Sequence, residues 1–316
     1  MQDRTLAAAA MIAGYAAIIG FTDNYVRVIA TDAGLWQFHA TRSAMGLVVL
    51  VAVSAIVGFR LRPRRFGAVL ARSAIHATAM MGYFGALAFL TVPQVAAGLF
   101  TAPIWVLLIT WLVYGRPIGV MRLLAVVAGF AGMILVLGPS VIEGASVAAA
   151  LPVLSGALYA VGNIATREWC AGESAGTLLG GFFAMLGVAG VLGMCVLAVW
   201  PLPVPEGTDG FVLRGMVEPT WRFLGWTLVQ AVGSLMAVAL MIRAYQVAEA
   251  GRVSVFEYVI LPASAFWGWV LWGETLHWTA WVGMALIVLA GVVIAMAGRD
   301  EGVSPPQPAA SGGGTG

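Results

Sequence analysis

Charge is what this sequence has least of. Only 9% of its 316 residues are charged, 61% are hydrophobic, and the mean hydropathy is +0.95. A soluble globular domain carries about 25% charged residues, so the composition excludes an ordinary soluble domain and predicts an integral membrane protein. Lysine is missing altogether, and all 16 basic residues are arginines.

Cysteine and the common catalytic motifs are also scarce. The two cysteines, Cys170 and Cys195, are too few for a disulfide framework or a zinc site. The chain contains neither an H-E-x-x-H zinc motif nor a glycine-rich phosphate loop ending in Gly-Lys-Ser/Thr. We therefore expect no cofactor and no ATP-driven mechanism.

Apolar runs of about 20 residues, each long enough to cross roughly 30 Å of hydrocarbon, are abundant. They show no period-two alternation, which favours helices over the strands of a barrel. The expected fold class is an all-α integral membrane bundle of ten transmembrane helices. The predicted spans are 6–29, 34–57, 73–92, 94–114, 120–138, 146–165, 176–199, 222–245, 252–272 and 278–297.

Arginine placement predicts the orientation. With the N-terminus in the cytoplasm, twelve arginines fall on the inner side, at positions 4, 60, 62, 64, 65, 72, 116, 122, 167, 243, 252 and 299. Such an excess is what the positive-inside rule describes. We expect an inner-membrane protein with both termini cytoplasmic and a disordered tail at 299–316. The basic run RLRPRRF is interpreted as a contact to anionic lipid headgroups rather than to nucleic acid.

The two halves of the chain resemble each other weakly. Pro103 matches Pro262, Leu112 matches Leu271, and Ala131-Gly132 matches Ala290-Gly291, all at one offset. Repeats 6–138 and 146–297 with five spans each would cross the membrane in opposite senses. This predicts the inverted-repeat design of secondary transporters, with a site at the interface of the repeats.

Two stretches carry a family resemblance. The run FEYVILPASAFWGWVLWGETL, from Phe256 to Leu276, and the stretch from Arg72 to Ile109 are similar to helices of the EamA-type transporters of the drug/metabolite transporter superfamily. The resemblance covers about residues 6–298 and implies a ten-helix bundle that moves a small metabolite by alternating access. The chain departs from the family pattern at YGRP, Tyr114 to Pro117, where Gly-Glu-Arg is common, whereas Gly273-Glu274 keeps the second-repeat version.

Charged side chains at membrane depth point to a binding site because they are costly unless they face a partner or a cavity. His39 and Arg42 lie on one helix face with Gly46 and form a cationic wall suited to a carboxylate or phosphate. Glu257 and Tyr258, on the other repeat, offer a counter-charge and a hydroxyl. An alternative is that Arg42 and Glu257 simply neutralise each other and hold helices together.

The remaining candidates have a structural alternative beside the functional one. Asn163 is interpreted first as a hydrogen-bonding contact between helices. His76 and Tyr83 share one helix face with Met80 and could line the cavity, and Tyr83 and Trp267 could stack on a substrate ring, although packing also explains them.

A further polar pair lies near the end of the first span. Asp23 and Arg27 are spaced i, i+4 and are predicted to form an ion pair.

The sequence thus predicts a secondary transporter that exports a small polar or zwitterionic metabolite, an amino acid or a related compound. The proton is a candidate coupling ion, taken up by Glu257. A homodimer is a candidate oligomeric state. The alternative is uptake of a larger, nucleoside-like or vitamin compound.

From another class, GESAG at 172–176 matches the G-x-S-x-G nucleophile elbow and would make the chain a membrane-embedded hydrolase. No strand is expected before its serine, so we interpret the match as chance.

Overall fold

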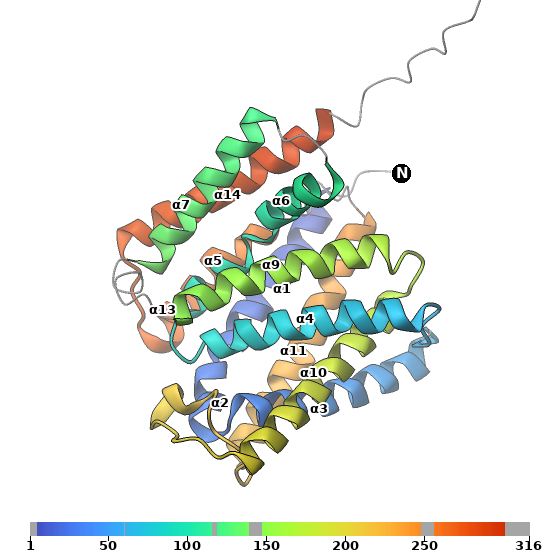
Figure 1. Cartoon of the computed structure of the whole chain (residues 1–316), viewed down its shortest axis with the longest axis vertical. Coiled ribbons are helices and arrows are strands. Elements are labelled where there is room, and N and C mark those ends of the chain that lie inside the picture. The colour runs from blue at the N-terminus through green and yellow to red at the C-terminus, as the bar shows by residue number, and fades with distance from the viewer. Residues whose placement is uncertain (1–4, 60, 116–118, 139–146, 248–255, 301–316) are drawn as a thin grey trace, which may run out of the picture.

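The computed structural model describes residues 5–300 except 60, 116–118, 139–146 and 248–255. Its regular elements there are all helical (Figure 1). They are α1 (Thr5–Asn24), α2 (Val26–Asp32), α3 (Leu35–Val57), α4 (Phe66–Ala86), α5 (Val92–Leu99), α6 (Ala102–Tyr114), α7 (Val120–Leu137), α9 (Val147–Glu168), α10 (Ala175–Val199), η1 (Gly207–Gly210), α11 (Trp221–Val247), η2 (Glu257–Val259), α13 (Ile260–Trp272) and α14 (Trp278–Asp300).

Each of the ten expected spans corresponds to helix in this structure, and three of them are built from two pieces. The first span breaks at Tyr25 between α1 and α2, the fourth divides into α5 and α6, and the ninth begins with the short 3₁₀ turn η2 before α13. Most of the tail expected at 299–316 lies outside the described residues, and α14 continues to Asp300. Broken helices at membrane depth are tolerated only where protein or a cavity satisfies the freed backbone groups.

The chain is a multi-pass membrane protein. Five stretches are long and apolar enough to cross a bilayer, Leu6–Asp32, Leu35–Val57, Val92–Val113, Ala175–Val199 and Trp221–Met241, and shorter apolar helices accompany them. Large apolar side chains such as Val48, Ile56 and Leu192 are exposed on the surface of the bundle. Exposure of so much apolar surface suits a hydrocarbon solvent and would make a soluble protein aggregate.

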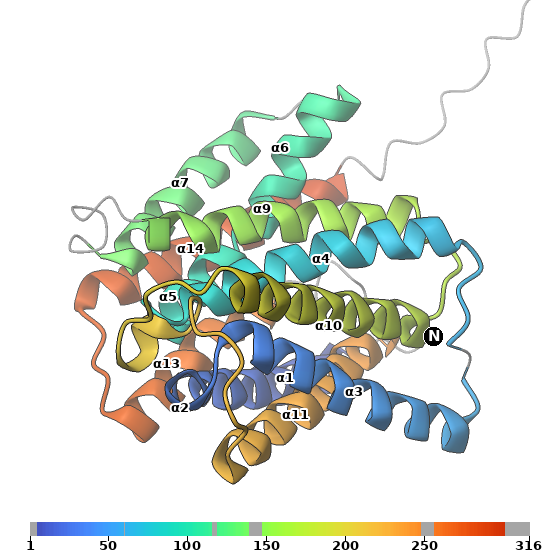
Figure 2. The same cartoon turned by 60° about the horizontal axis from the view of Figure 1, so that its bottom comes forward.

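The helices pack in a layered bundle in which distant parts of the chain lie side by side (Figures 1 and 2). The principal pairs are α7 with α14, α3 with α10, α1 with α11, and α4 with α9. Further contacts join α1 to α13, α9 to α5 and α6, α10 to α4, and α11 to α3. Every one of these pairs combines one element from before residue 139 with one from after it, so neither half of the chain forms its core alone.

Glycines allow two of these pairs to approach closely. An ideal Cβ on Gly132 of α7 would lie 2.6 Å from the carbonyl oxygen of Gly283 on α14, and one on Gly283 would lie 2.4 Å from that of Gly132. Between α10 and α3, a Cβ on Gly190 would come within 2.6 Å of the backbone of Trp36 and Ala40. Small residues of this kind let membrane helices associate through backbone contact.

Candidate functional site

A cluster of buried polar side chains lies between α1, α3, α4 and α11. We call its members, Asp23, His39, Arg42, Tyr83 and Gln230, the Asp23 cluster. Each of the five is at most 5% exposed. The cluster lies toward the end of the bundle that holds the 200–221 segment, here named the loop end, since Arg42 is only seven residues, about 10 Å of helix, beyond the first residue of α3.

Asp23 is held by two neutral donors. The hydroxyl of Tyr83 donates to its Oδ2 at 2.8 Å, and Nε2 of Gln230 donates to its Oδ1 at 2.8 Å. Asp23 is the second-last residue of α1, directly before the break at Tyr25. The carboxylate therefore joins α1, α4 and α11 at the point where the first span is interrupted.

Arg42 is caged by aromatic rings instead of hydrogen-bond acceptors. Its guanidinium carbon lies 5.0, 5.4 and 5.9 Å from the ring centres of Phe84, Phe183 and Phe38. Its Nε and Nη1 have no hydrogen-bond partner among the described residues. The guanidinium does interact electrostatically with Asp23, which makes Asp23 the carboxylate in range of this cation.

Other buried polar atoms on α3 and α11 are also unsatisfied. Within the described part of the chain, both ring nitrogens of His39, the hydroxyls of Ser43 and Thr227, and Oε1 of Gln230 lack a hydrogen-bond partner. Each buried polar group left unpaired costs about 1–3 kcal/mol, and native structures rarely concentrate several in one place. A ligand that supplies the missing partners would recover this cost, so we regard the cluster as the candidate binding site.

The expected ion pair between Asp23 and Arg27 is wrong. Arg27 instead donates to Glu274 at 2.5 Å and lies 5.1 Å from the ring centre of Trp272. The i, i+4 rule holds within one continuous helix, but the helix is interrupted at Tyr25, between the two residues. Asp23 consequently faces the interior while Arg27 reaches the end of α13.

The sequence suggested Glu257 and Tyr258 as the wall opposite Arg42, and their described contacts include residues of α9 and α14. Glu257 is half-buried in η2 and interacts electrostatically with Tyr159 of α9. Tyr258 is buried, and its hydroxyl lies 2.2 Å from the position of an ideal Cβ on Gly291. The carboxylate described as interacting with Arg42 is Asp23, and a role of Glu257 in binding stays a prediction.

His76 and Asn163 belong to a second polar group, between α4 and α9. Nε2 of His76 is 3.3 Å from Oδ1 of Asn163, and its Nδ1 is 3.2 Å from the carbonyl oxygen of Arg72. The Arg72 guanidinium donates to Thr166 at 2.8 Å and to the carbonyl oxygen of Leu178 at 3.3 Å. These side chains are satisfied, so the helix-joining interpretation of Asn163 describes its observed contact.

One face of α4 connects the two polar groups. His76 and Tyr83 are seven residues apart, two helical turns or about 10 Å along the axis, and Met80 lies between them in the core. The expected common face of these three residues therefore runs from the second polar group to the Asp23 cluster.

Trp267 lines an apolar groove. The groove has a volume of about 630 Å³ and is lined by α1, α11 and α13, including Phe21, Gly233, Met236 and Trp267. Phe21 packs edge-on against Trp267 with ring centres 5.0 Å apart. The observed partner of the Trp267 ring is therefore another aromatic side chain.

The 200–221 segment covers the loop end above the Asp23 cluster. Its Phe211 is fully buried, accepts a backbone hydrogen bond from Leu35 at 2.7 Å, and lies 6.3 Å from the ring of Phe38. The amide of Gln37 pairs with the backbone of Val217 through two bonds of 2.8 and 2.9 Å.

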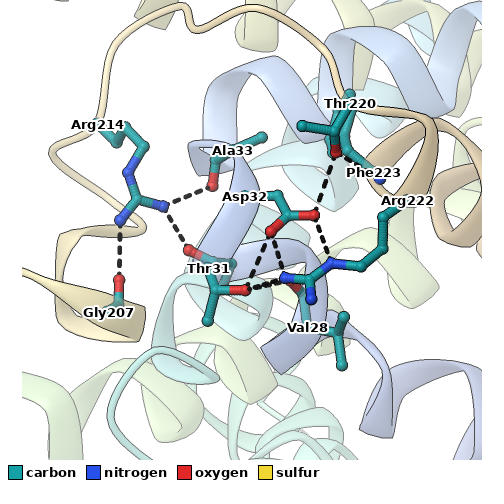
Figure 3. A network of polar contacts seen from close by, with 10 residues as sticks. Val28, Thr31, Asp32, Ala33, Gly207, Arg214, Thr220, Arg222 and Phe223 are labelled. Carbon is teal, nitrogen blue, oxygen red and sulfur yellow. Dashed lines mark hydrogen bonds and ion pairs between the residues drawn. The ribbon is translucent and has the colours of Figure 1, made fainter.

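Two arginines tie this segment to the end of α2 (Figure 3). Arg222 binds both carboxylate oxygens of Asp32, with its Nε donating to Oδ2 at 2.8 Å. Arg214 donates to the carbonyl oxygens of Ala30 at 2.5 Å and Gly207 at 2.8 Å. These contacts close the bundle over the site at the loop end.

The serine of GESAG has a structural explanation. Ser174 is the N-cap of α10, and its Oγ accepts a hydrogen bond from the backbone N–H of Thr177 at 3.0 Å. The neighbouring Glu173 accepts bonds from the backbone N–H groups of Arg64 and Arg65, both at 2.7 Å. Polar capping residues are the usual start of a helix, so the motif match needs no catalytic role.

Sequence reasoning missed Gln230, Thr227 and Ser43 as site residues and assigned Asp23 to the wrong partner. A signal was present in α11, because Thr227 and Gln230 are polar side chains three residues apart in an otherwise apolar stretch. Which neighbour they face was not readable, since it depends on how α11 packs against α1 and α3.

Comparison with known proteins agrees with this architecture. Residues 6–138 match the EamA-like transporter family. A riboflavin transporter of Rhizobium johnstonii is 27% identical over 227 residues, which cover 71% of this chain and 68% of that protein. The first half of the chain, residues 6–138, therefore resembles the EamA-like transporter family.

Further relatives of this chain differ in their named substrates. The pseudopaline exporter CntI of Pseudomonas aeruginosa is 26% identical over 255 residues, 80% of this chain and 83% of the exporter. A protein of known crystal structure superimposes with a TM-score of 0.58 at 16% identity over 92% of this chain and 98% of its own, which shows the shared fold alone. The expected resemblance to EamA-type transporters is confirmed over residues 6–138, and both named relatives are transporters.

Proposed function

We propose that this EamA-like transporter moves riboflavin or a closely similar heteroaromatic metabolite across the membrane. The observation that carries the proposal is the Asp23 cluster, in which unpaired donors and acceptors lie among aromatic rings. A planar ring system bearing carbonyl and N–H groups would stack on the rings and supply the missing hydrogen bonds. The named substrate of the Rhizobium johnstonii relative has this chemistry.

The charge balance of the cluster favours this vitamin-type substrate over the zwitterion that the sequence suggested. A zwitterion would need two charged side chains in the site, one cationic and one anionic, that are not already paired with each other. Arg42 already interacts with Asp23, so the described cluster contains one cation and one carboxylate. A neutral, hydrogen-bonding substrate would enter this site without a further desolvated charge, which is costly in a low-dielectric interior.

Alternating access would follow from two inverted repeats, 6–138 and 146–297. In these repeats α1, α3, α4 and α7 would correspond to α9, α10, α11 and α14. Exchanging the two halves then turns the α1–α11 contact into the α9–α4 contact, and the α10–α4 contact into the α3–α11 contact. The α3–α10 and α7–α14 pairs map onto themselves, as expected for a two-fold axis in the membrane plane. Gly115 and Gly273 end α6 and α13 in the same left-handed conformation, with φ of 64° and 67°.

The orientation and energy source also belong to the proposal. The arginine distribution supports an inner-membrane location with cytoplasmic termini, which would place the loop end on the outer side. A proton gradient would be one driving force, with Asp23 replacing Glu257 as the carboxylate closest to the binding site. The lipid bilayer and the small-molecule substrate are then the partners required.

Counterflow in proteoliposomes tests the substrate. Vesicles loaded with unlabelled riboflavin should take up labelled riboflavin faster than protein-free vesicles, and excess unlabelled amino acids outside should not compete. Trans-stimulated exchange of amino acids, without exchange of riboflavin, would refute the proposal and restore the zwitterion alternative.

A further inference from the structure

Gln230 has a fixed orientation that follows from the chemistry of its neighbour. An ionised carboxylate can only accept hydrogen bonds, so the Gln230 amide must turn its NH₂ group toward Asp23, as the 2.8 Å contact shows. The amide oxygen is thereby directed elsewhere, and it is buried without a hydrogen-bond partner in the described residues. Asp23 acts here as a positioning residue.

The second donor to Asp23 strengthens this assignment. The Tyr83 hydroxyl donates its only proton in a hydrogen bond to Oδ2 of Asp23, at 2.8 Å. Neither Tyr83 nor Asp23 can therefore offer a proton to the Gln230 oxygen. The remaining buried cluster members, His39 and Arg42, present unpaired nitrogens.

Within the described residues, the cluster thus presents the unpaired acceptor of Gln230 together with unpaired N–H donors of Arg42, and a neutral His39 adds one donor and one acceptor nitrogen. We infer that Gln230 is a specificity-determining residue that accepts a hydrogen bond from the imide or lactam N–H of a heteroaromatic substrate, while Arg42 donates to the adjacent carbonyl. This assignment rests on the proposed function. It adds which edge of the substrate ring the protein recognises, namely the edge that carries the N–H group and the adjacent carbonyl. A substrate lacking the N–H would leave the Gln230 oxygen buried and unpaired.

The flanking rings support a flat ligand at this edge. Phe84 lies edge-on to His39 with ring centres 5.0 Å apart and also contacts Arg42. Phe183 packs against the space that Gly46 leaves free, since a Cβ there would lie 3.0 Å from its ring. Aromatic and guanidinium planes of this kind stack favourably on a heteroaromatic ring.

A chemical change in the substrate tests the inference without altering the protein. Riboflavin and riboflavin methylated on its ring imide nitrogen are compared as competitors of labelled riboflavin counterflow in proteoliposomes. For the wild type, the methylated compound should compete at least about 5-fold and up to about 100-fold less well, because it leaves a buried acceptor unpaired.

Two variants locate the effect at Gln230. Gln230→Met removes the acceptor at similar length, so the two competitors should become equal within about two-fold. Ser234→Ala is the matched control, since Ser234 is a buried polar residue of the same helix whose hydroxyl is satisfied by the carbonyl oxygen of Ala231 at 3.0 Å. It should keep the wild-type ratio.

The outcomes separate this inference from the proposed function. Equal competition by both compounds in the wild type, or a wild-type ratio retained in Gln230→Met, would overturn the role of Gln230 while riboflavin transport stands. Competition by zwitterionic amino acids for the same flux would also overturn it. Absence of riboflavin exchange in the wild type would refute the proposed function and this inference with it.

Discussion

Replacing Arg42 by methionine should abolish transport while leaving the folded protein nearly as stable as the wild type. Arg42 is 4% exposed, and its Nε and Nη1 have no partner among the described residues. Relieving two such groups gains about 1–3 kcal/mol each. Losing three ring contacts costs about 0.5–2 kcal/mol each, so these two effects are of similar size. Asp23 would also lose the cation with which it interacts, and we expect its carboxyl to take up a proton rather than stay buried as an uncompensated charge.

We therefore expect the free energy of unfolding of Arg42→Met to change by less than about 1 kcal/mol, or to rise. Arg72→Met is the matched control, because Arg72 is a largely buried arginine whose guanidinium is hydrogen-bonded to Thr166 and Leu178. Losing bonds to a charged group costs about 1.5–3 kcal/mol each, so this variant should be clearly less stable.

The assay combines thermal unfolding in detergent with riboflavin counterflow per folded molecule. If Arg42 binds the substrate, Arg42→Met should keep an unfolding midpoint close to that of the wild type and should lose riboflavin exchange. A marked drop in the midpoint of Arg42→Met, together with wild-type exchange by the molecules that remain folded, would show that Arg42 only holds helices together.

Three further predictions concern the coupling carboxylate, the helix cap and the helix crossing. Asp23→Asn should lose accumulation driven by a pH gradient and reduce riboflavin counterflow much less, whereas the peripheral Asp32→Asn should keep both; gradient-driven accumulation by Asp23→Asn would exclude this carboxylate as the coupling group. Ser174→Ala should lower the free energy of unfolding by about 1 kcal/mol, the usual value of a helix N-cap, with transport unchanged, and labelling of Ser174 by a fluorophosphonate would argue for the hydrolase instead. Gly132→Leu should prevent close contact of α7 with Gly283 and lower the unfolding midpoint by several degrees, while unchanged stability would show that this crossing contributes little.

Several features of the fold and site were predictable from the sequence because they depend on composition and local spacing. The length of the apolar runs predicted the ten spans. The 3.6-residue period of a helix placed His39 and Arg42 on one face, and His76 and Tyr83 on another. The high cost of burying a charge marked Arg42 as a candidate before any contact was known.

What the sequence by itself determined is therefore the solvent of the chain, the positions of its helices and the side chains that are expensive to bury. Only the tertiary structure decided which of those side chains meet. Asp23 and Arg27 look like neighbours by spacing, but the break at Tyr25 separates them, and Asp23 pairs with Gln230, which is 207 residues away. Such a contact depends on the crossing of α1 with α11, and helix crossings are set by packing over the whole surface of both helices, which no local pattern encodes.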